Sequence, residues 1–380
     1  MIVIPRGLAR SVRALARKCV SGRPRGPAPP VVFECRDGTL TAAVRTADAV
    51  LIHTNATRYP DGVLVVPMAV LEAVEGAGDD PVELAAGRDR RGEARWADRG
   101  VPRTYPFEAV PPGPAHRPPA PPAEGHPAQP AFLTALHECG QTADRQAGGR
   151  YALSRVQVRG AAGQVAGTDA RVALVWGGFA LPFAAEVLVP ALPVFGCREL
   201  TGAGAVRVGR TPDELVVAAG PWRVHLPVDP AGRFPDLCGL MPRPDATAAE
   251  LHDADAAELL AALPDLPGAD AEHRAVTLDL SDGVVVRARD GVAGATREVR
   301  LARSTATGPP VRAAVDRRRS PAPWRSGAGP SGSRQPSDRW LSRGATRPSS
   351  PSPSTRPSPS APCWLTRNAP APNPPRGGPL

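Results

Sequence analysis

The stretch VVFECRDGTLTAAV (residues 31–44) predicts a β-hairpin. Its arms, 31–35 and 39–44, are apolar enough for strands, and the Asp37-Gly38 pair between them favours the tight turn of an antiparallel hairpin. Ahead of it, apolar residues recur at helical spacing and predict a helix over residues 6–20, whose buried face carries Leu8, Val12, Leu15 and Cys19. A helix beside antiparallel strands indicates an α+β fold, in which helices pack on antiparallel sheets.

The same order of elements occurs three times along the chain. Further helices are predicted at 131–146 and 254–263, followed by strands at 152–158, 164–167 and 172–176 in the second copy and at 275–280, 284–288 and 297–302 in the third. Corresponding elements lie roughly 120 residues apart, which is too long for a solenoid repeat. We therefore expect three tandem domains, at 1–107, 131–243 and 250–318, the last of them partial.

Two segments have compositions that disfavour a packed core. Residues 108–130 contain nine prolines in 23 positions, which predicts an extended, semi-rigid linker. From Ser320 onward, 27 of 61 residues are Pro or Ser, so we expect residues 319–380 to form a disordered tail.

The positive charge is concentrated at two places. The chain has 46 basic and 37 acidic residues among 380, a net charge of +9, yet the first 30 residues alone carry +7 and residues 320–380 another +7. Arg6, Arg10, Arg13 and Arg17 recur at helical spacing on one face of the first helix, with no acid between them. Such a stripe is typical either of a merely solubilising surface or of a phosphate-binding face, and its single sign favours the second.

No catalytic or metal-binding pattern occurs in the sequence. The six cysteines are scattered without a CxxC pair and follow no secretory signal, which predicts reduced thiols in a cytoplasmic protein. The seven histidines have no metal-ligand spacing, and the run His137, Glu138 and Cys139 could supply a nucleophile and a base but has no identifiable third group to orient them. An apolar run at 177–196 is interrupted by Glu186 and three prolines, so no membrane span is expected. We expect no cofactor and no enzymatic activity.

Four stretches carry a resemblance to a known family. They are RYAL (residues 150–153), GTDARVAL (167–174), VLVPA (187–191) and AGRFPDLCGLMP (231–242). In this order they resemble landmarks of the middle domain of the bacterial sliding clamp, the beta subunit of DNA polymerase III. The resemblance implies a non-catalytic processivity factor: a homodimeric ring of similar domains, with helices around a central hole that encircles double-stranded DNA.

The resemblance also implies which residues contact DNA. Arg23 matches an arginine at the rim of the pore, and four residues fall on the pore-facing first helix: Arg10, Arg13, Arg17 and Lys18. Weaker candidates come from the helices of the second domain, namely Arg145, Gln146 and Arg198.

The family's peptide groove would bind DNA polymerase III and clamp-loader subunits through short linear peptides. The matching positions are Leu153, Thr168, Arg171, Val172 and Pro242. The family usually has a Gly-His pair after the aspartate, whereas here that pair is compressed and Ala170 directly precedes Arg171. The sequence also has no counterpart of the groove wall that the family's third domain supplies. Peptide binding is therefore expected to be weak.

The third domain stops resembling a clamp after residue 318. We interpret the tail as a frame-shifted or decayed continuation, the alternative being a basic disordered arm that adds nonspecific affinity for nucleic acid. Two functions remain open: a sliding clamp or diverged paralogue, and a clamp-fold binding module or scaffold that has lost dimerisation and does not form a ring.

Overall fold

The computed structural model describes ten stretches of the chain, which fall into two compact units. The described residues are 1–22, 26–122, 125–145, 151–170, 172–237, 247–268, 275–290, 294–317, 339–342 and 363–368. The first unit consists of Met1–His137 with Ala180–Ala231, and the second of Glu138–Phe179 with Gly232–Leu380. The three domain boundaries expected from the sequence stay a prediction.

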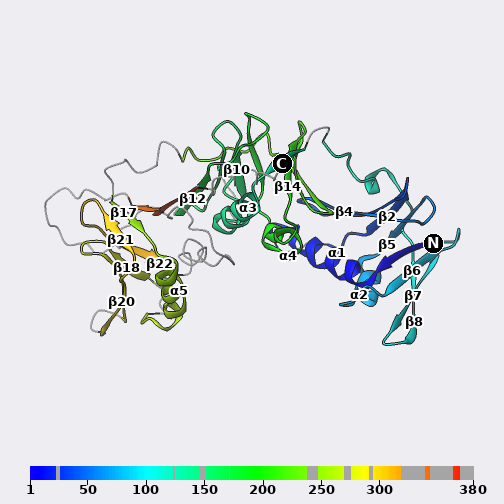
Figure 1. The fold of residues 1–380 in the computed structure, drawn as a ribbon, viewed down its shortest axis with the longest axis horizontal. Coiled ribbons are helices and arrows are strands. Elements are labelled where there is room, and N and C mark those ends of the chain that lie inside the picture. Colours follow the sequence, from blue (N-terminus) through cyan, green and yellow to red (C-terminus); the bar gives the residue numbers. More distant parts are fainter. Residues whose placement is uncertain are drawn as a thin grey trace, which may run out of the picture. The chain divides into compact units, whose positions relative to one another are not determined.

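The helices of the first unit form one layer (Figure 1). The helix predicted at the N-terminus is α1 (Arg6–Lys18), and its apolar stripe is buried, with Val12 and Leu15 almost inaccessible. It packs against α2 (Met68–Val74) and against the 3-10 turn η2 (Pro193–Gly196), which leads into the short helix α4 (Arg198–Thr201). Strand β13 (Glu186–Pro190) precedes η2.

An eight-stranded sheet extends through the first unit. Its strands run in the order β5 (Gly62–Val66), β2 (Val31–Arg36), β3 (Thr39–Arg45), β4 (Val50–Ala56), β16 (Trp222–Pro227), β15 (Glu214–Ala219), β14 (Val206–Arg210) and β9 (His126–Ala128). The predicted hairpin is β2 and β3, paired from Val31 with Val44 to Arg36 with Thr39. Its turn uses positive φ angles at Asp37 (49°) and Gly38 (72°), as an Asp-Gly turn requires.

A second sheet of the first unit has four strands, β1 (Ile2–Pro5), β6 (Pro81–Ala86), β7 (Arg91–Asp98) and β8 (Val101–Glu108), in that order. Its buried side chains include Ile4, Val82 and Leu84. β7 and β8 form a hairpin whose two-residue loop, Arg99 and Gly100, again has positive φ at both positions. β8 is the last strand of the sheet.

The proline-rich linker contains two short elements that its composition did not predict. Residues Pro114–His116 form the 3-10 turn η1, and β9 pairs with β14 in register Val206–Ala128. The three-residue pairing tolerates Pro127 because β9 is the edge strand of its sheet.

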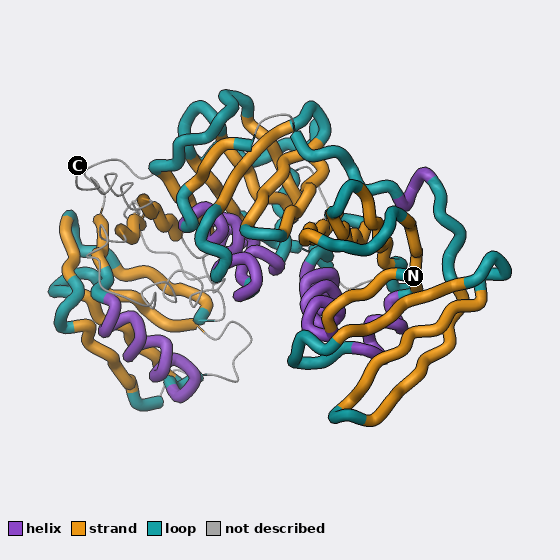
Figure 2. The backbone as a smooth tube through the Cα atoms, turned by 45° about the vertical axis from the view of Figure 1, so that its right-hand side comes forward, coloured by secondary structure: helices purple, strands orange, loops and turns teal. Residues whose placement is uncertain are grey.

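The second unit also contains two sheets and a helix. One sheet includes, in order, β10 (Arg155–Arg159), β11 (Gln164–Thr168), β12 (Val172–Gly177), β24 (Cys363–Asn368), β23 (Arg339–Ser342), β17 (Thr247–Glu250) and β21 (Thr305–Thr307). The other has the order β20 (Thr296–Leu301), β19 (Val284–Arg289), β18 (Ala275–Asp279) and β22 (Arg312–Asp316). Helix α5 (Asp253–Ala262) continues into η3 (Leu263–Asp265) and lies across this second sheet (Figure 2).

The tail differs from the expectation at the two strands that the structure describes. β24 pairs in parallel with β12, and β23 pairs with both β24 and β17. The remaining residues of 319–380 lie outside the described part of the chain. Helix α3 (Ala131–Thr142) is the remaining α-helix among the described residues. The predicted α+β class, with helices packed on antiparallel sheets, is confirmed, and among the described residues no helix is long and apolar enough to cross a membrane.

Candidate nucleic-acid interface

The arginine stripe of α1 divides into a paired edge and an exposed face. Arg10, Arg17 and Lys18 are exposed and form no ion pair within the described parts of the chain. Arg6 and Arg13 border the buried face instead, on the side of α2, and are only partly accessible. Cationic side chains that remain in solvent can attract phosphates, whereas paired ones contribute much less.

Arg6 and Arg13 connect α1 to α2. The Arg6 guanidinium donates to the Val74 and Glu75 carbonyl oxygens at 3.0 and 3.1 Å and to the Asp98 carboxylate at 2.9 Å. This hydrogen bond from Arg6 lowers the pKa of Asp98. Arg13 donates to Glu75 at 2.7 Å and to Glu72 at 2.5 Å. With two carboxylates around it, Arg13 is better explained as a structural residue than as the DNA contact that the resemblance implied.

Arg198 is an exposed cation on α4, the short helix beside α1. It is the first residue of α4, its side chain is 83% exposed, and within the described part of the chain it pairs only with the adjacent Glu199, at 3.6 Å. Burial and the Glu199 carboxylate raise the pKa of the Cys197 thiol, and the ammonium group of Lys18 opposes this shift, which places Lys18 near the start of α4. We call Arg10, Arg17, Lys18 and Arg198 the cationic helix face. Figure 1 shows α4, α1 and α2 side by side.

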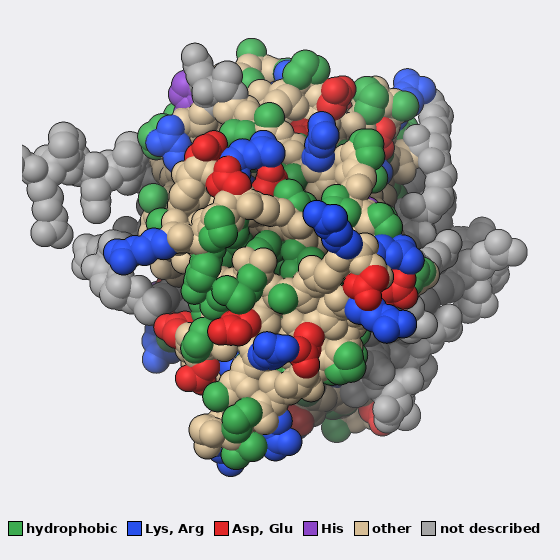
Figure 3. Space-filling model, turned by 90° about the vertical axis from the view of Figure 1, so that its right-hand side faces the viewer, with side chains coloured by type: hydrophobic (Ala, Val, Ile, Leu, Met, Phe, Trp, Pro, Cys, Tyr) green, Lys and Arg blue, Asp and Glu red, His purple; other side chains and the backbone are tan. Residues whose placement is uncertain are grey.

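Other surfaces carry both signs of charge. Arg36 and Arg95 on the sheets of the first unit form ion pairs with Glu34 and Glu93, and Arg90 in the turn before β7 forms one with Glu108. The face in Figure 3 has red and blue side chains next to one another, with apolar side chains gathered near its centre. A surface of this kind has no net attraction for a polyanion, which distinguishes the cationic helix face from it.

Of the remaining predicted DNA contacts, the structure describes Arg145. Arg145 lies in the second unit, where its guanidinium donates to the Gly140 carbonyl oxygen at 3.4 Å and burial lowers its pKa. Arg23 and Gln146 lie outside the described residues.

Of the groove residues that the structure describes, Thr168 and Val172 belong to one tight turn of the second unit. Thr168 is buried, donates its hydroxyl to the Val172 carbonyl oxygen at 2.7 Å and accepts from the Ala170 amide at 3.0 Å. Ala170 has a φ of 69°, a left-handed conformation that is uncommon for alanine. Leu153 is partly buried and its carbonyl accepts from the Asp144 amide. Arg171 and Pro242 lie outside the described residues, so the peptide groove stays a prediction.

Glu138 and Cys139, considered above as possible catalytic residues, are bonded within the packed structure. Glu138 accepts a hydrogen bond from the Trp176 indole at 3.0 Å, and the Cys139 thiol is buried against the Val165 carbonyl oxygen. Among the described residues, no group of three or more His, Cys, Asp or Glu side chains could hold a metal ion.

Sequence reasoning missed two further features of the first unit. One is a small cavity lined by Arg45, His116 and Arg117, and the other is a pair of prolines, Pro102 and Pro106, on the last strand of a sheet. The sequence analysis predicted no strand at these residues, so the position of the prolines on a strand edge came only from the structure. The cavity could not be predicted from the sequence either, because it joins residues about 70 positions apart.

Comparison with known proteins gives a fold. No protein-family model matches the chain, and no curated protein matches it. Among solved structures, DNA polymerase III subunit beta from Pseudomonas aeruginosa is 15% identical with a TM-score of 0.64, covering 90% of this chain and 92% of that one. Caulobacter crescentus pol III beta is 18% identical (TM-score 0.64, 89% and 92% covered), and the subunit from Borrelia burgdorferi is 10% identical (TM-score 0.67, 89% and 91% covered). The chain therefore has the fold of the DNA polymerase III beta sliding clamps.

Proposed function

We propose that this chain is a DNA sliding clamp or a diverged paralogue of one, a cytoplasmic, non-catalytic processivity factor that encircles duplex DNA. The observation that carries the proposal is the cationic helix face: Arg10, Arg17 and Lys18 are exposed and form no ion pair with any described residue, and the Arg198 side chain is 83% exposed. Contacts from such a face reach phosphates and read no base, so binding is independent of sequence and permits sliding. In this proposal a head-to-tail homodimer closes the ring.

The partners belong to the same proposal. The turn that brings Thr168 to Val172 supports a site for short linear peptides of DNA polymerase III and clamp-loader subunits. The hydroxyl of Thr168 is already used within the turn, so peptide recognition there depends on apolar contacts.

The DNA contacts can be tested by the salt dependence of binding. Substituting Arg10, Arg17 and Lys18 by alanine removes three unpaired charges, and we expect the slope of log K against log salt to fall by about three for a labelled duplex. A control with the same loss of charge replaces the exposed Arg36, Arg91 and Arg95 of the sheets by alanine. Equal losses of slope in both variants would contradict the proposed face.

Encirclement is a separate claim with its own measurement. A topological clamp leaves DNA through free ends, so the protein should remain on a nicked circular plasmid and be lost from the same plasmid after linearisation. Equal retention on both forms would show simple binding and would favour the second candidate.

The second candidate, an open clamp-fold binding module or scaffold, is supported by the edge of β8. The two-residue loop makes Asp98 and Val101 a hydrogen-bonded pair, and such pairs alternate along the hairpin. Pro102 and Pro106 therefore occupy the non-bonded positions, and their nitrogens face the free edge. Four residues of β8 turn their backbone groups outward, and two of them, Pro102 and Pro106, have no N–H to donate to an approaching strand.

A further inference from the structure

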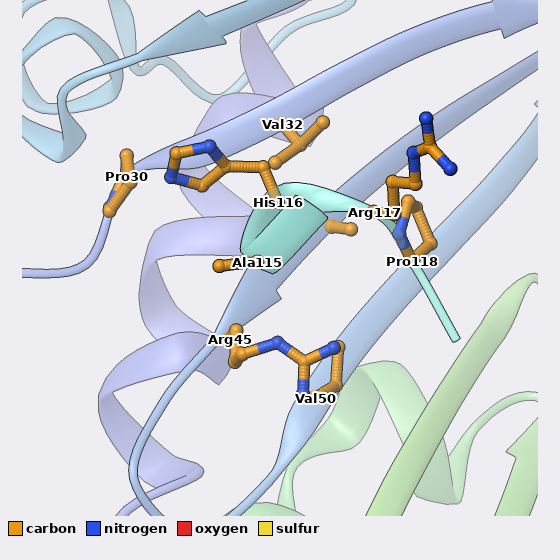
Figure 4. Close-up of a pocket in the computed structure, with 9 residues that line it drawn as sticks. Pro30, Val32, Arg45, Val50, Ala115, His116, Arg117 and Pro118 are labelled. Carbon is orange, nitrogen blue, oxygen red and sulfur yellow. The ribbon is translucent and has the colours of Figure 1, made fainter. Parts of the chain in front are cut away.

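A cavity of about 180 Å³ lies in the first unit beneath the linker (Figure 4). Its floor is the sheet face that carries Val32, Ala43 and Val50. The linker covers it at η1, through Ala115 and Pro118, and Val110 packs on the same apolar cluster. The cavity is therefore walled by apolar groups on both sides.

Basic side chains line this cavity together with the apolar ones. Arg45 and Arg117 are exposed lining residues, none of the nine lining residues is acidic, and neither arginine forms an ion pair with any residue that the structure describes. The Nδ1 atom of His116 accepts a hydrogen bond from the Gly113 amide at 3.2 Å, which leaves the proton of the neutral ring on Nε2 as a donor. In Figure 4, His116 reaches toward Pro30 and the Arg45 side chain extends beside Val50.

A third arginine adds to the positive potential. Arg223 is opposite Ile52 in the sheet, on the same face as the cavity floor, and its buried Nε atom has no hydrogen-bond partner among the described residues. Burial lowers the pKa of His225, and the charges of Arg223 and Arg45 lower it further, against the hydrogen bond that the His225 ring donates to the Glu214 carboxylate. Both guanidinium groups therefore lie close to His225, next to Val50.

The size of the cavity selects the kind of ligand. Sites for whole small molecules usually enclose about 300–1,000 Å³, whereas this volume matches one large aliphatic side chain. The exposed arginines require that the group left outside carry negative charge. We propose that this cavity binds a short acidic peptide segment, with one aliphatic side chain between the linker and the sheet and the neighbouring carboxylates on Arg45 and Arg117.

The test uses the full chain and a fluorescein-labelled nonapeptide of glycine and serine that contains one leucine between two aspartates. We expect saturable binding in fluorescence anisotropy. Ala115→Leu, which fills the cavity from the linker, should weaken binding at least about tenfold. The double variant Arg45→Glu with Arg117→Glu should weaken it by a similar factor or more.

Matched controls separate the site from general effects. Ala120→Leu adds the same side chain at an exposed linker position outside the cavity, and Arg36→Glu with Arg88→Glu makes the same change in charge on exposed positions elsewhere. Both should stay within about twofold of the wild type. The proposal is overturned if the peptide shows no saturable binding up to about 1 mM, if the controls lose as much as the cavity variants, or if a peptide with lysines in place of the aspartates binds equally well.

Discussion

Gly167 is the residue at which β11 approaches the backbone of α3 most closely. A Cβ atom there would overlap the Cys139 carbonyl oxygen, although the φ angle of Gly167 is not in the left-handed region. Because a helix backbone cannot yield as a side-chain end does, Gly167→Ala should lower the free energy of unfolding by about 2–4 kcal/mol. Gly62→Ala is the matched control, since a Cβ on this strand residue meets nothing within 4 Å. It should leave stability unchanged or raise it by about 0.5 kcal/mol in urea denaturation. Equal losses in the two variants would contradict the close approach.

The arginines of α1 show what a sequence can and cannot predict at the scale of a residue. Helical spacing predicted the stripe, and the structure confirms that Arg10 and Arg17 share an exposed face. Helical spacing could not predict that Arg13 forms ion pairs, because its partners Glu72 and Glu75 are about 60 positions away in the sequence. Arg13→Ala should therefore reduce stability by about 1 kcal/mol and leave the salt slope of DNA binding nearly unchanged. Arg17→Ala should leave stability nearly unchanged and lower the salt slope of DNA binding. Urea denaturation combined with DNA titration at several salt concentrations distinguishes the two variants.

At the scale of elements, β4 pairs with β16 in the middle of the eight-stranded sheet of the first unit, and His53 lies in this β4–β16 seam. Its ring packs edge-on against Trp222, with centroids 4.5 Å apart, and its buried Nδ1 has no partner among the described residues. Burial lowers the pKa of His53 from 6.5 to about 4. The folded state thus favours the neutral ring. The contribution of neutral His53 to the stability of the fold is fully present above pH 6.5 and is lost as the pH falls from 6.5 toward 4.

The prediction for this seam is a stability that depends on pH through one residue. The melting temperature of the wild type should fall by several degrees between pH 7 and pH 4.5, and His53→Phe, which keeps the aromatic contact without a titrating group, should reduce that fall. His126→Phe replaces an exposed histidine of β9 and should not. If both variants lose as much melting temperature between pH 7 and pH 4.5 as the wild type, His53 is not the source of the pH dependence of stability.

Local elements were predictable and their long-range pairing was not. The Asp-Gly turn fixes the β2–β3 hairpin within 14 residues, so composition and periodicity were sufficient. The β4–β16 seam pairs His53 with Trp222, almost 170 positions away, and no periodic signal encodes such a partner. Likewise, the Pro and Ser content of the tail predicted disorder and concealed the short apolar groups of β23 and β24.

At the scale of the whole molecule, the sheets differ in which strand edges are paired and which are left. In the first unit, the last strand of β9-β14-β15-β16 pairs with the edge of β5-β2-β3-β4. The two four-stranded sheets have the orders β1-β6-β7-β8 and β22-β18-β19-β20, so β8 and β20 are edge strands. Neither has a neighbouring strand on its outer side among the described residues. In the proposed ring, the β8 edge of one copy would pair with the β20 edge of another.

The prolines of β8 make that closure weak, and replacing them should strengthen it. Pro102→Thr with Pro106→Thr restores two N–H donors on the outward side, while the hydrogen bonds to β7 stay unchanged because these positions do not form them. At about 0.5–1.5 kcal/mol for each hydrogen bond, self-association should become at least about fivefold tighter in sedimentation equilibrium, and retention on circular DNA should rise with it. Pro111→Thr with Pro112→Thr, at exposed linker positions, is the control and should change neither. If the β8 variant associates no better than this control, the β8 edge is not where two copies meet, and the chain acts as an open module.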